Sequence, residues 1–484
     1  MTGLLLVIKL RERGIRNITL LEKADTCGGT WRENTYPGIA CDVPSHAYTY
    51  SFEPNPDWSH HFPPGREIYE YFEKVFYKYG INYCTRFNEA VMRCEFDDEQ
   101  ERWRVGTSQG NTYEADLVFC ATGILHHPKL PDIPGLDAFE GPAFHSARWD
   151  HTVELQGKRI GVIGNGSSAT QIVVELVQIP GTRVTVFQRT PQWIVKMDDR
   201  AFSEYEKRRF RKQPWRIRLI RRLSALVYSQ GTAALTNDDW WHRQVHKLTS
   251  WNARRYIRAS VKDPVLRAKL TPDYEFGCKR VVINAKFYDA MQRPNAHLVT
   301  DAIQRVEKNG ILTRDPSGKE TLHELDLIVM ATGFDPTAYM RPMRFTGRHG
   351  LTIEQAWQDK ISAYCSMCIP GFPNFFLMLG PNSPIGNQSV IEISEHQSDY
   401  AMQLVRQWQS GALPVIEARP EALGRWRAMI KNKMRRTVWV SGCQSWYLDA
   451  EGDSIAWPDS WNNWLKTMES PVISDFVAGR PGDR

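Results

Sequence analysis

The sequence lacks any apolar run long enough to cross a lipid bilayer. Its N-terminal apolar stretch, residues 4–8, runs straight into the cations Lys9, Arg11 and Arg13. A membrane helix needs about 20 apolar residues, and a signal peptide carries its charges before its apolar region, so the stretch fits neither. An excess of one charge is also missing, because the net charge is only +6 over 484 residues. We expect a soluble globular protein with no membrane span and no nucleic-acid partner.

One segment departs from this even distribution of charge. Residues 207–222 hold nine lysines and arginines among sixteen residues, interleaved with Phe210, Trp215 and Ile217. A nucleic-acid or membrane surface can have this pattern, but a solvated basic helix, or a positive field for nucleotide phosphates, is the favoured interpretation.

Cysteine is scarce, with nine residues, an odd number, scattered through the chain. In a long chain this predicts reduced thiols in a cytoplasmic compartment rather than a disulfide framework. Cys365 and Cys368 form a lone CxxC without a second such pair. A redox or metal-binding role for these two cysteines is the weaker alternative, and we predict no metal site.

The length favours two or three domains in a large enzyme, because single cores stop growing near roughly 250 to 300 residues. An approximate repeat indicates two similar units. A buried strand expected over residues 117–119 leads into Ala121-Thr122-Gly123, and one expected over 327–329 leads into Ala331-Thr332-Gly333. The repeat predicts an α/β fold with two Rossmann-like nucleotide-binding domains.

The first unit begins inside a β-α-β motif. Residues 3–13 are predicted as a helix and residues 18–21 as a strand that ends on Glu22, 19 residues after Gly3. An acidic residue at this place hydrogen-bonds a ribose diol in dinucleotide-binding folds. The strand before the helix and the first two glycines of GxGxxG are not found. We therefore expect either a truncated start or a protein that cannot hold this nucleotide.

The second unit has every part of the motif. A strand is predicted over residues 159–163, a helix over 170–177, and Gly164-Asn165-Gly166-Ser167-Ser168-Ala169 forms a GxGxxA turn between them. Gly164 permits the sharp turn, Gly166 lets the backbone approach a pyrophosphate, and Ala169 lets helix and strand pack closely.

The end of the next strand, predicted over residues 184–187, selects the cofactor. Arg189 and Thr190 follow it, with Arg189 20 residues past Ala169, where an acidic residue would indicate NADH. A guanidinium and a hydroxyl suit a 2′-phosphate, which predicts NADPH. The alternative is a glycine turn with an incidental surface arginine.

Residues 196–276 differ in composition from both units. Arginine, tryptophan and tyrosine are frequent there and strand-like runs are few, which predicts a helical insertion that caps the site. From Gly380 to Phe476 the chain is predicted to be mostly helical, without a further catalytic motif.

The segment between the two units carries the most specific motif. Residues 139–150, FEGPAFHSARWD, match FxGxxxHxxxW[P/D] at every defined position. This resembles the fingerprint of type I Baeyer-Villiger monooxygenases, whereas the related N- and S-oxygenating flavin monooxygenases usually have Tyr or Phe at the position of Trp149. The resemblance implies that His145 acts within the linker, where its hydrogen bonds can couple domain rotation to cofactor position. A satisfied structural histidine is the alternative.

Two N-terminal segments extend the resemblance. Residues 28–31, GGTW, resemble the family's GG[TV]W segment beside the flavin, and residues 36–42, YPGIACD, resemble its YPGxxCD loop. The implied cofactor contacts on this side are Gly28, Gly29, Thr30, Trp31, Arg32, Glu33, Asp42, Val43 and Tyr48 for FAD, with Ala40, Cys41 and Asp42 facing the nicotinamide nucleotide. On the other side Ile163 precedes the NADPH turn at residues 164–169.

Residues 276–280, FGCKR, resemble the family's GxKR. The resemblance implies that Lys279 binds the 2′-phosphate and that Arg280 is the catalytic cation, although two adjacent cations after a glycine are more often surface charges. A fixed guanidinium can stabilise negative charge that forms on oxygen, and Asp42 can orient it. Trp446 resembles a mobile-loop tryptophan near the substrate, with a core or surface aromatic as the alternative.

The resemblance implies that FAD, NADPH and O2 convert a ketone to an ester or lactone. It implies an FAD domain over residues 1–138 and 346–484, a linker over 139–150, and an NADPH domain over 151–345 that contains the insertion. Residues 271–280 are similar to fungal members from aflatoxin and sterigmatocystin biosynthesis, which implies secondary metabolism and an anthraquinone ketone such as hydroxyversicolorone. An N- or S-oxygenating flavin monooxygenase and a catalytically dead binding protein are the alternatives.

Overall fold

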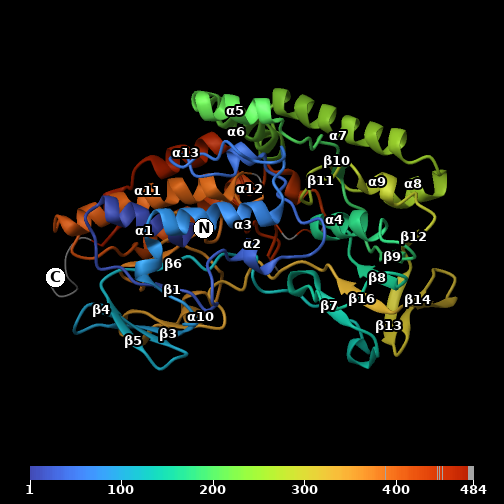
Figure 1. The fold of residues 1–484 in the computed structure, drawn as a ribbon. Coiled ribbons are helices and arrows are strands. Elements are labelled where there is room, and N and C mark those ends of the chain that lie inside the picture. The colour runs from blue at the N-terminus through green and yellow to red at the C-terminus, as the bar shows by residue number, and fades with distance from the viewer. Residues whose placement is uncertain (387, 444, 446, 450, 478–484) are drawn as a thin grey trace.

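The computed structural model describes residues 1–477 except 387, 444, 446 and 450. Trp446 therefore lies outside the described residues. Figure 1 shows two α/β regions side by side, with a row of helices across the top of both. The predicted fold class is confirmed by this arrangement and by the sheets described next.

The region at the right of Figure 1 is built on a five-stranded sheet in which every pairing is parallel. The strand order is β12 (Ala296–Val299), β9 (Arg183–Phe187), β8 (Arg159–Ile163), β16 (Leu327–Met330) and β7 (Ala143–His145). Ile160, Val162 and Val186 are fully buried, as expected where both faces of a parallel sheet are covered. Helix α4 (Ser167–Leu176) follows β8, so the predicted strand, turn and helix of the second unit are confirmed.

The region at the left of Figure 1 contains the N-terminal unit. Helix α1 (Thr2–Glu12) leads to β1 (Leu20–Leu21), which pairs in parallel with β2 (Thr85–Arg86). A Cβ atom on Gly3 would lie 3.2 Å from Cδ1 of Leu20. Glycine therefore allows the close approach of helix and strand that the third glycine of GxGxxG provides.

The C-terminal part of the chain returns to this left-hand region. Strand β18 (Phe375–Leu377) pairs in parallel with β6 (Val118–Cys120). Three helices follow: α11 (Val390–Gln409), α12 (Pro420–Met434) and α13 (Trp461–Glu469). Leu6 and Leu10 of α1 share one core cluster with Ile393 of α11, which lies along α1 in Figure 1. The predicted helical return is confirmed.

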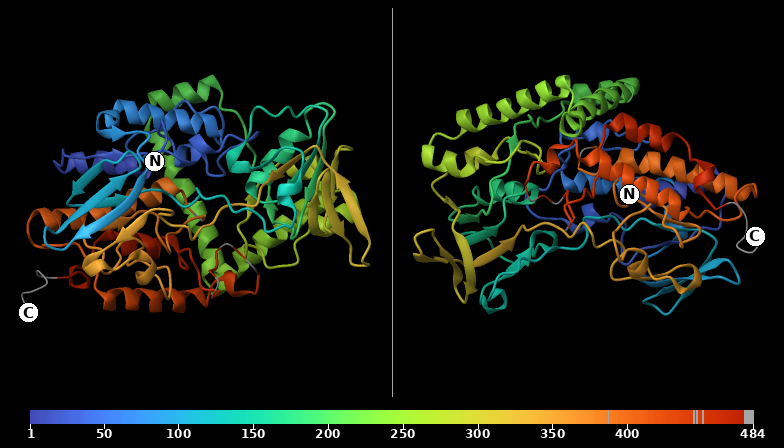
Figure 2. Two further views of the ribbon diagram at one scale, coloured as in Figure 1. Left: turned by 90° about the horizontal axis from the view of Figure 1, so that it is seen from below. Right: turned by 180° about the vertical axis from the view of Figure 1, so that it is seen from behind.

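Two smaller sheets lie at opposite ends of the molecule, as both views in Figure 2 show. One contains β17 (Arg344–Thr346), β3 (Val91–Asp97), β4 (Arg102–Thr107) and β5 (Thr112–Ala115), and the other β13 (Ala302–Glu307), β14 (Gly310–Arg314) and β15 (Glu320–Glu324). Other short or isolated elements are α2 (Thr30–Glu33), α3 (Gly65–Lys78), α9 (Phe287–Ala290), α10 (Ile353–Ala356), β10 (Ile194–Val195) and β11 (Val282–Ile283).

The helices at the top and upper right of Figure 1 form the predicted helical insertion. They are α5 (Glu204–Lys212), α6 (Trp215–Thr236), α7 (Trp240–Ser260) and α8 (Pro264–Leu270). Asp239 and Asp263 accept hydrogen bonds from the first turns of α7 and α8, which satisfies backbone donors that the helix leaves free. In the basic segment Phe210 and Ile217 are buried while Arg218 is exposed, so an apolar side faces the protein and charged residues face solvent.

The cysteines correct one expectation. Cys278 and Cys443 form a disulfide across 165 residues, whereas the sequence predicted that all thiols are reduced. The other seven cysteines are free. Because tertiary contact brings the two together, their spacing in the sequence carried no sign of the pair. Within the described ranges, no helix has the length and apolarity needed to cross a membrane.

Candidate active site

A large cavity lies between the two α/β regions. Its volume is about 1900 Å³, and its walls include Gly29 from the N-terminal unit, Gly164 from the second unit and Tyr228 from the insertion. A single small-molecule pocket measures roughly 300 to 1,000 Å³. The cavity is therefore large enough for more than one bound molecule.

Most of the predicted site residues meet at this cavity. Those that line it are Gly28, Gly29, Thr30, Trp31, Ala40, Cys41, Asp42, Val43, Tyr48, Ile163, Gly164, Asn165, Gly166, Ser167, Ser168, Arg189, Thr190, Lys279 and Arg280. Glu22, Arg32, Glu33, His145 and Ala169 lie outside the lining and contact other parts of the protein.

The GxGxxA turn has the geometry that a dinucleotide needs. Gly164 has φ +110°, and a Cβ atom there would lie 2.5 Å from the carbonyl oxygen of Ala331. A Cβ on Gly166 would meet nothing within 4 Å, so its backbone is open to the cavity. Ala169 is fully buried in the packing of α4. The turn fits the pyrophosphate of a dinucleotide at the start of α4.

Two cations stand together beyond this turn. Lys279 and Arg189 both line the cavity. Burial lowers the pKa of the Lys279 ammonium, and the positive charge of Arg189 lowers it further. Because two like charges repel, their close placement favours a bound anion between them. The pair fits a phosphate group, and NADPH carries one that NADH lacks.

The GGTW segment forms a second glycine turn on the opposite wall. Gly29 has φ +55° and precedes α2, and a Cβ atom on it would meet nothing within 4 Å. Trp31 donates a hydrogen bond from Nε1 to Tyr48 Oη at 3.1 Å. Backbone open to the cavity beside these two aromatic side chains fits a flat cofactor.

Glu22 and Arg32 form an ionic network behind this turn. Arg32 lies 3.3 Å from the carboxylate of Glu22 and 3.1 Å from that of Glu33. Glu22 also accepts a hydrogen bond from the amide of Ala24 at 3.0 Å. In this conformation the Glu22 carboxylate bonds its own loop, and its predicted contact with a ribose stays a prediction.

Asp42 and Arg280 form an ion pair on the cavity wall. Arg280 Nη2 donates to Asp42 Oδ2 at 2.6 Å, with 31 % and 20 % of the two side chains exposed. The negative charge of Asp42 raises the pKa of Arg280 above its ordinary value. The guanidinium is therefore a permanent, oriented positive charge that faces the cavity.

The loop that carries Asp42 is held by residues that sequence reasoning missed. Tyr36 donates from Oη to Gln171 Oε1 at 3.0 Å, and Gln171 donates from Nε2 to the carbonyl of Ala40 at 3.0 Å. Gly38 has φ +79°, and a Cβ there would lie 2.7 Å from Cγ of Glu175. Glycine therefore lets the loop lie against α4 of the other unit. The YPG motif points to Gly38, but no sequence signal identifies Gln171.

The helical insertion also contacts the backbone of Asp42. Tyr228 of α6 donates from Oη to the carbonyl oxygen of Asp42 at 3.2 Å. Burial raises the pKa of Tyr228, and the charge of Asp42 acts in the same direction. Tyr228 is a neutral hydrogen-bond donor at physiological pH. Its position within a long amphipathic helix made it indistinguishable from an ordinary packing residue in the sequence.

His145 ends β7, the edge strand of the five-stranded sheet. The side chain is buried, its Nδ1 accepts a hydrogen bond from the amide of Ala147, and its ring packs against Phe334. Burial lowers its pKa, and a contact with the Gly333 backbone acts in the opposite direction. His145 thus connects the linker to the turn after β16, and it does not line the cavity.

The structure does not support the alternative of a redox or metal-binding role for Cys365 and Cys368. Both thiols are free and buried, and burial raises the pKa of Cys365 to about 12. A thiol is reactive toward metals and oxidants as its thiolate. These two cysteines behave as small apolar core residues.

Comparison with known proteins identifies the family of this chain. A family model described as pyridine nucleotide-disulphide oxidoreductase matches residues 2–213. A Baeyer-Villiger monooxygenase of Streptomyces coelicolor is 40 % identical over 482 residues, covering 99 % of this chain and 91 % of that protein. The chain belongs to the Baeyer-Villiger monooxygenase family. The family predicted from the fingerprint at residues 139–150 is confirmed.

Other monooxygenases also match most of the chain. An uncharacterized monooxygenase of Mycobacterium tuberculosis is 43 % identical over 439 residues, covering 91 % of this chain and 86 % of that protein. An FAD-binding monooxygenase of Aspergillus niger is 34 % identical over 496 residues, covering 98 % and 80 %. A solved structure of an oxidized steroid monooxygenase bound to NADP is 27 % identical, covers 99 % of this chain and 97 % of that one, and has a TM-score of 0.85.

Proposed function

We propose that this protein is a monooxygenase that uses FAD, NADPH and O2 to convert a ketone to an ester or lactone. The observation that carries the proposal is the Asp42–Arg280 ion pair on the cavity wall, at 2.6 Å. Its surroundings support two cofactors, since one glycine turn opens onto the cavity from each α/β region. A flavin bound there would supply the reaction with O2 and the transfer of one of its oxygen atoms to the substrate, with electrons from NADPH, chemistry that protein side chains cannot supply.

The side chains on the wall have separate parts in this reaction. Lys279 and Arg189 bind the 2′-phosphate of NADPH, and the turn at Gly164 binds its pyrophosphate. Arg280 stabilises negative charge on the oxygens of the reacting groups as it develops. Asp42 holds the guanidinium in place and keeps it charged.

The walls also have to keep water away from the reacting oxygen. We propose that the insertion contributes to this exclusion, because Tyr228 of α6 closes onto the Asp42 loop. His145 is proposed as a positioning residue that couples the linker to the turn after β16. It does not touch the reacting atoms in this proposal.

The domain limits follow from the same assignment. We propose an FAD domain over residues 1–138 and 346–484, a linker over 139–150, and an NADPH domain over 151–345. Pairing of β18 with β6 and packing of α11 against α1 support the return of the C-terminal part to the first domain. A cytoplasmic location is part of the proposal, because NADPH is supplied there.

The substrate class is proposed to be a ketone, with aromatic polyketide ketones of the anthraquinone type as the narrower possibility. The resemblance of residues 271–280 to fungal enzymes of secondary metabolism supports this narrower class. A cavity of about 1900 Å³ leaves room for a polycyclic ketone beside the cofactors.

Turnover with a panel of ketones tests the proposal. Purified protein is loaded with FAD, supplied with NADPH and air, and given cyclic, linear, steroid and anthraquinone ketones together with an amine and a thioether. Ester or lactone products detected by mass are expected. Only N- or S-oxides would support the alternative oxygenase, and a colourless protein that cannot be reconstituted with FAD would support the catalytically dead alternative.

A further inference from the structure

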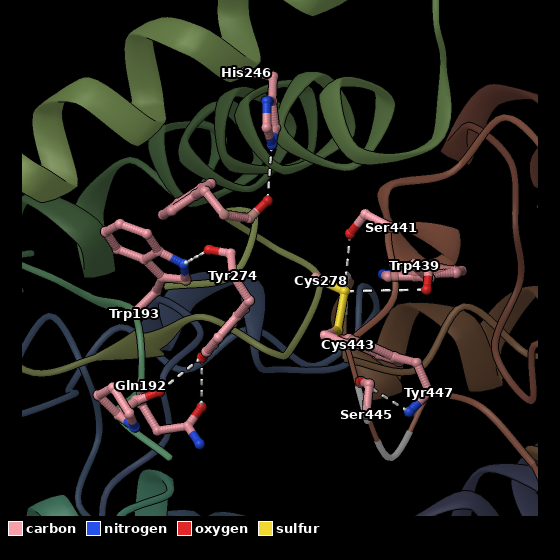
Figure 3. Close-up of a disulfide and its surroundings, with 12 residues drawn as sticks. Gln192, Trp193, His246, Tyr274, Cys278, Trp439, Ser441, Cys443, Ser445 and Tyr447 are labelled. Carbon is pink, nitrogen blue, oxygen red and sulfur yellow. Dashed lines mark hydrogen bonds between the residues drawn. A yellow bond between two sulfur atoms is a disulfide. The ribbon is translucent and has the colours of Figure 1, made fainter. Parts of the chain in front are cut away.

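A disulfide ties the loop that carries Arg280 to a distant segment of the chain. Cys278, which directly precedes Lys279 and Arg280, is bonded to Cys443 across 165 residues (Figure 3). Cys443 lies in the C-terminal segment that follows α12 and belongs to the N-terminal α/β region. The bond therefore joins the two regions at the edge of the cavity.

The segment on the Cys443 side forms part of the cavity wall. Trp439 and Tyr447 are buried, and their rings stack with centroids 4.8 Å apart. Tyr447 lines the cavity. Burial raises its pKa to about 12, while the charge of Arg280 acts to lower it, so its hydroxyl lies within electrostatic reach of the guanidinium. A shift of this segment would change the surroundings of Arg280.

The two sulfur atoms differ in their access to solvent. Cys278 is fully buried and accepts a hydrogen bond from Ser441 Oγ at 3.2 Å, whereas Cys443 is only partly buried. Cys443 is therefore the more exposed residue of the pair, and the proposed attack of a thiolate from solution takes place on its sulfur. The sulfur displaced by that attack belongs to Cys278, and the hydrogen bond from Ser441 Oγ can stabilise it as a leaving thiolate.

The free cysteines do not share these properties, because six of the seven are buried and the seventh, Cys84, does not line the cavity. Cys41, Cys94 and Cys368 are buried, and burial raises the pKa of each thiol, which suppresses the reactive thiolate. Cytoplasmic disulfides are uncommon and are usually transient, with catalytic or redox-sensing roles. A single partly accessible disulfide beside a catalytic cation fits such a role.

We propose that Cys278–Cys443 is a reversible thiol-disulfide site that positions the Arg280 loop and responds to dithiols and peroxide. The disulfide form holds the segment with Tyr447 against the Arg280 loop, and the dithiol form releases it. This inference rests on the proposed function of Arg280.

The chemistry requires a dithiol reductant and a peroxide oxidant. In reduction, one thiolate of the dithiol attacks the Cys443 sulfur, the Cys278–Cys443 bond breaks, and Cys278 leaves as a thiolate that takes up a proton. The second thiolate of the reductant then displaces Cys443 and leaves an oxidised reductant. In the reverse direction hydrogen peroxide converts the Cys443 thiolate to a sulfenic acid with release of hydroxide, and Cys278 displaces a second hydroxide to form the disulfide.

The state of the cysteines is measured first, by counting thiols with a maleimide under denaturing conditions. The FAD-loaded protein, purified without reductant in air, is expected to bind seven maleimides, one for each free cysteine. After dithiothreitol treatment all nine cysteines of the chain should react. Nine labels before treatment would overturn the proposal.

The effect on the site is measured with Cys443→Ser and with Cys84→Ser as the matched control. Cys84 is free, lies beside Arg11 near the C-terminal end of α1, and does not line the cavity. Cys443→Ser and the dithiothreitol-reduced native protein are expected to raise the KM for ketone by about two- to tenfold, the cost of ordering one or two side chains, with a smaller change in kcat. Both should release more hydrogen peroxide per NADPH and bind NADP+ more weakly.

Three comparisons decide the outcome. Dithiothreitol should leave Cys443→Ser unchanged, and Cys84→Ser should behave as the native protein in every assay. Unchanged KM, peroxide release and NADP+ affinity in Cys443→Ser, with the disulfide present in the native protein, would overturn the positioning role. Absence of ester from the native protein would instead count against the proposed function, and the thiol count and NADP+ affinity would still decide on the disulfide.

Discussion

Replacing Arg280 by alanine removes the positive charge that the proposed chemistry depends on. Lys279, Arg189 and the Gly164 turn are left in place, so NADPH should still bind and reduce the flavin. Ester formation should fall by about 10² to 10³, which is the usual cost of removing one preorganised donor from a site where negative charge develops. Without the guanidinium the oxygen-dependent step is no longer stabilised electrostatically. The release of hydrogen peroxide should therefore rise as ester formation falls.

The structure also indicates how much Arg280→Ala should destabilise the folded protein. Asp42 would lose its 2.6 Å partner and become an unpaired carboxylate that is 20 % exposed. Loss of a hydrogen bond to a charged group costs about 1.5 to 3 kcal/mol. The melting temperature should therefore fall modestly, and the same fall should not occur in the double variant Asp42→Asn/Arg280→Ala, in which the charge is removed as well.

The assay separates the two half-reactions. Stopped-flow absorbance follows flavin reduction by NADPH without oxygen, and mass spectrometry follows ester in air. Arg243→Ala, at an exposed position on α7, is the control for loss of one arginine. Native ester yield in Arg280→Ala would refute the role of this guanidinium, and loss of flavin reduction in the same variant would mean that it serves NADPH binding instead.

Three further predictions concern the NADPH site and the loop that holds Asp42. Lys279→Ala should lower kcat/KM for NADPH by about ten- to a hundredfold, the cost of a charge-assisted hydrogen bond, and leave that for NADH nearly unchanged. Burial and the charge of Arg189 lower the pKa of Lys279, and only its ammonium form attracts the phosphate. NADP+ affinity, measured by calorimetry, should therefore weaken as the pH rises toward this pKa. Lys279→Arg should abolish this dependence on pH. Gly38→Ala should lower the melting temperature more than Gly110→Ala, because both glycines have φ near +80° but only Gly38 would place its Cβ against Glu175.

Local patterns in the sequence predicted the second nucleotide unit closely. The strand expected over residues 159–163 has the same bounds as β8, and the glycines of the following turn have the conformation and space expected of them. This success has a physical reason. Strand, turn and helix in this motif are specified by residues a few positions apart, so that burial pattern and glycine placement are sufficient.

Contacts between distant segments could not be predicted from the sequence. Gln171 fixes the Asp42 loop through a hydrogen bond to Ala40, and Tyr228 reaches it from an inserted helix. In the sequence, neither Gln171 nor Tyr228 can be distinguished from any other residue of a helix. The disulfide of Cys278 with Cys443 likewise depends on how two regions meet, which residue spacing does not encode. The Asp42–Arg280 pair was expected only because both residues resemble those of a known family.

The most direct measurement of the central claim is turnover of a ketone under isotopically heavy O2. We expect an ester or lactone that carries one heavy oxygen atom, formed only when FAD and NADPH are both present, and lost in Arg280→Ala. An ester without the heavy atom, or oxygen found only in N- or S-oxides or in hydrogen peroxide, would contradict it.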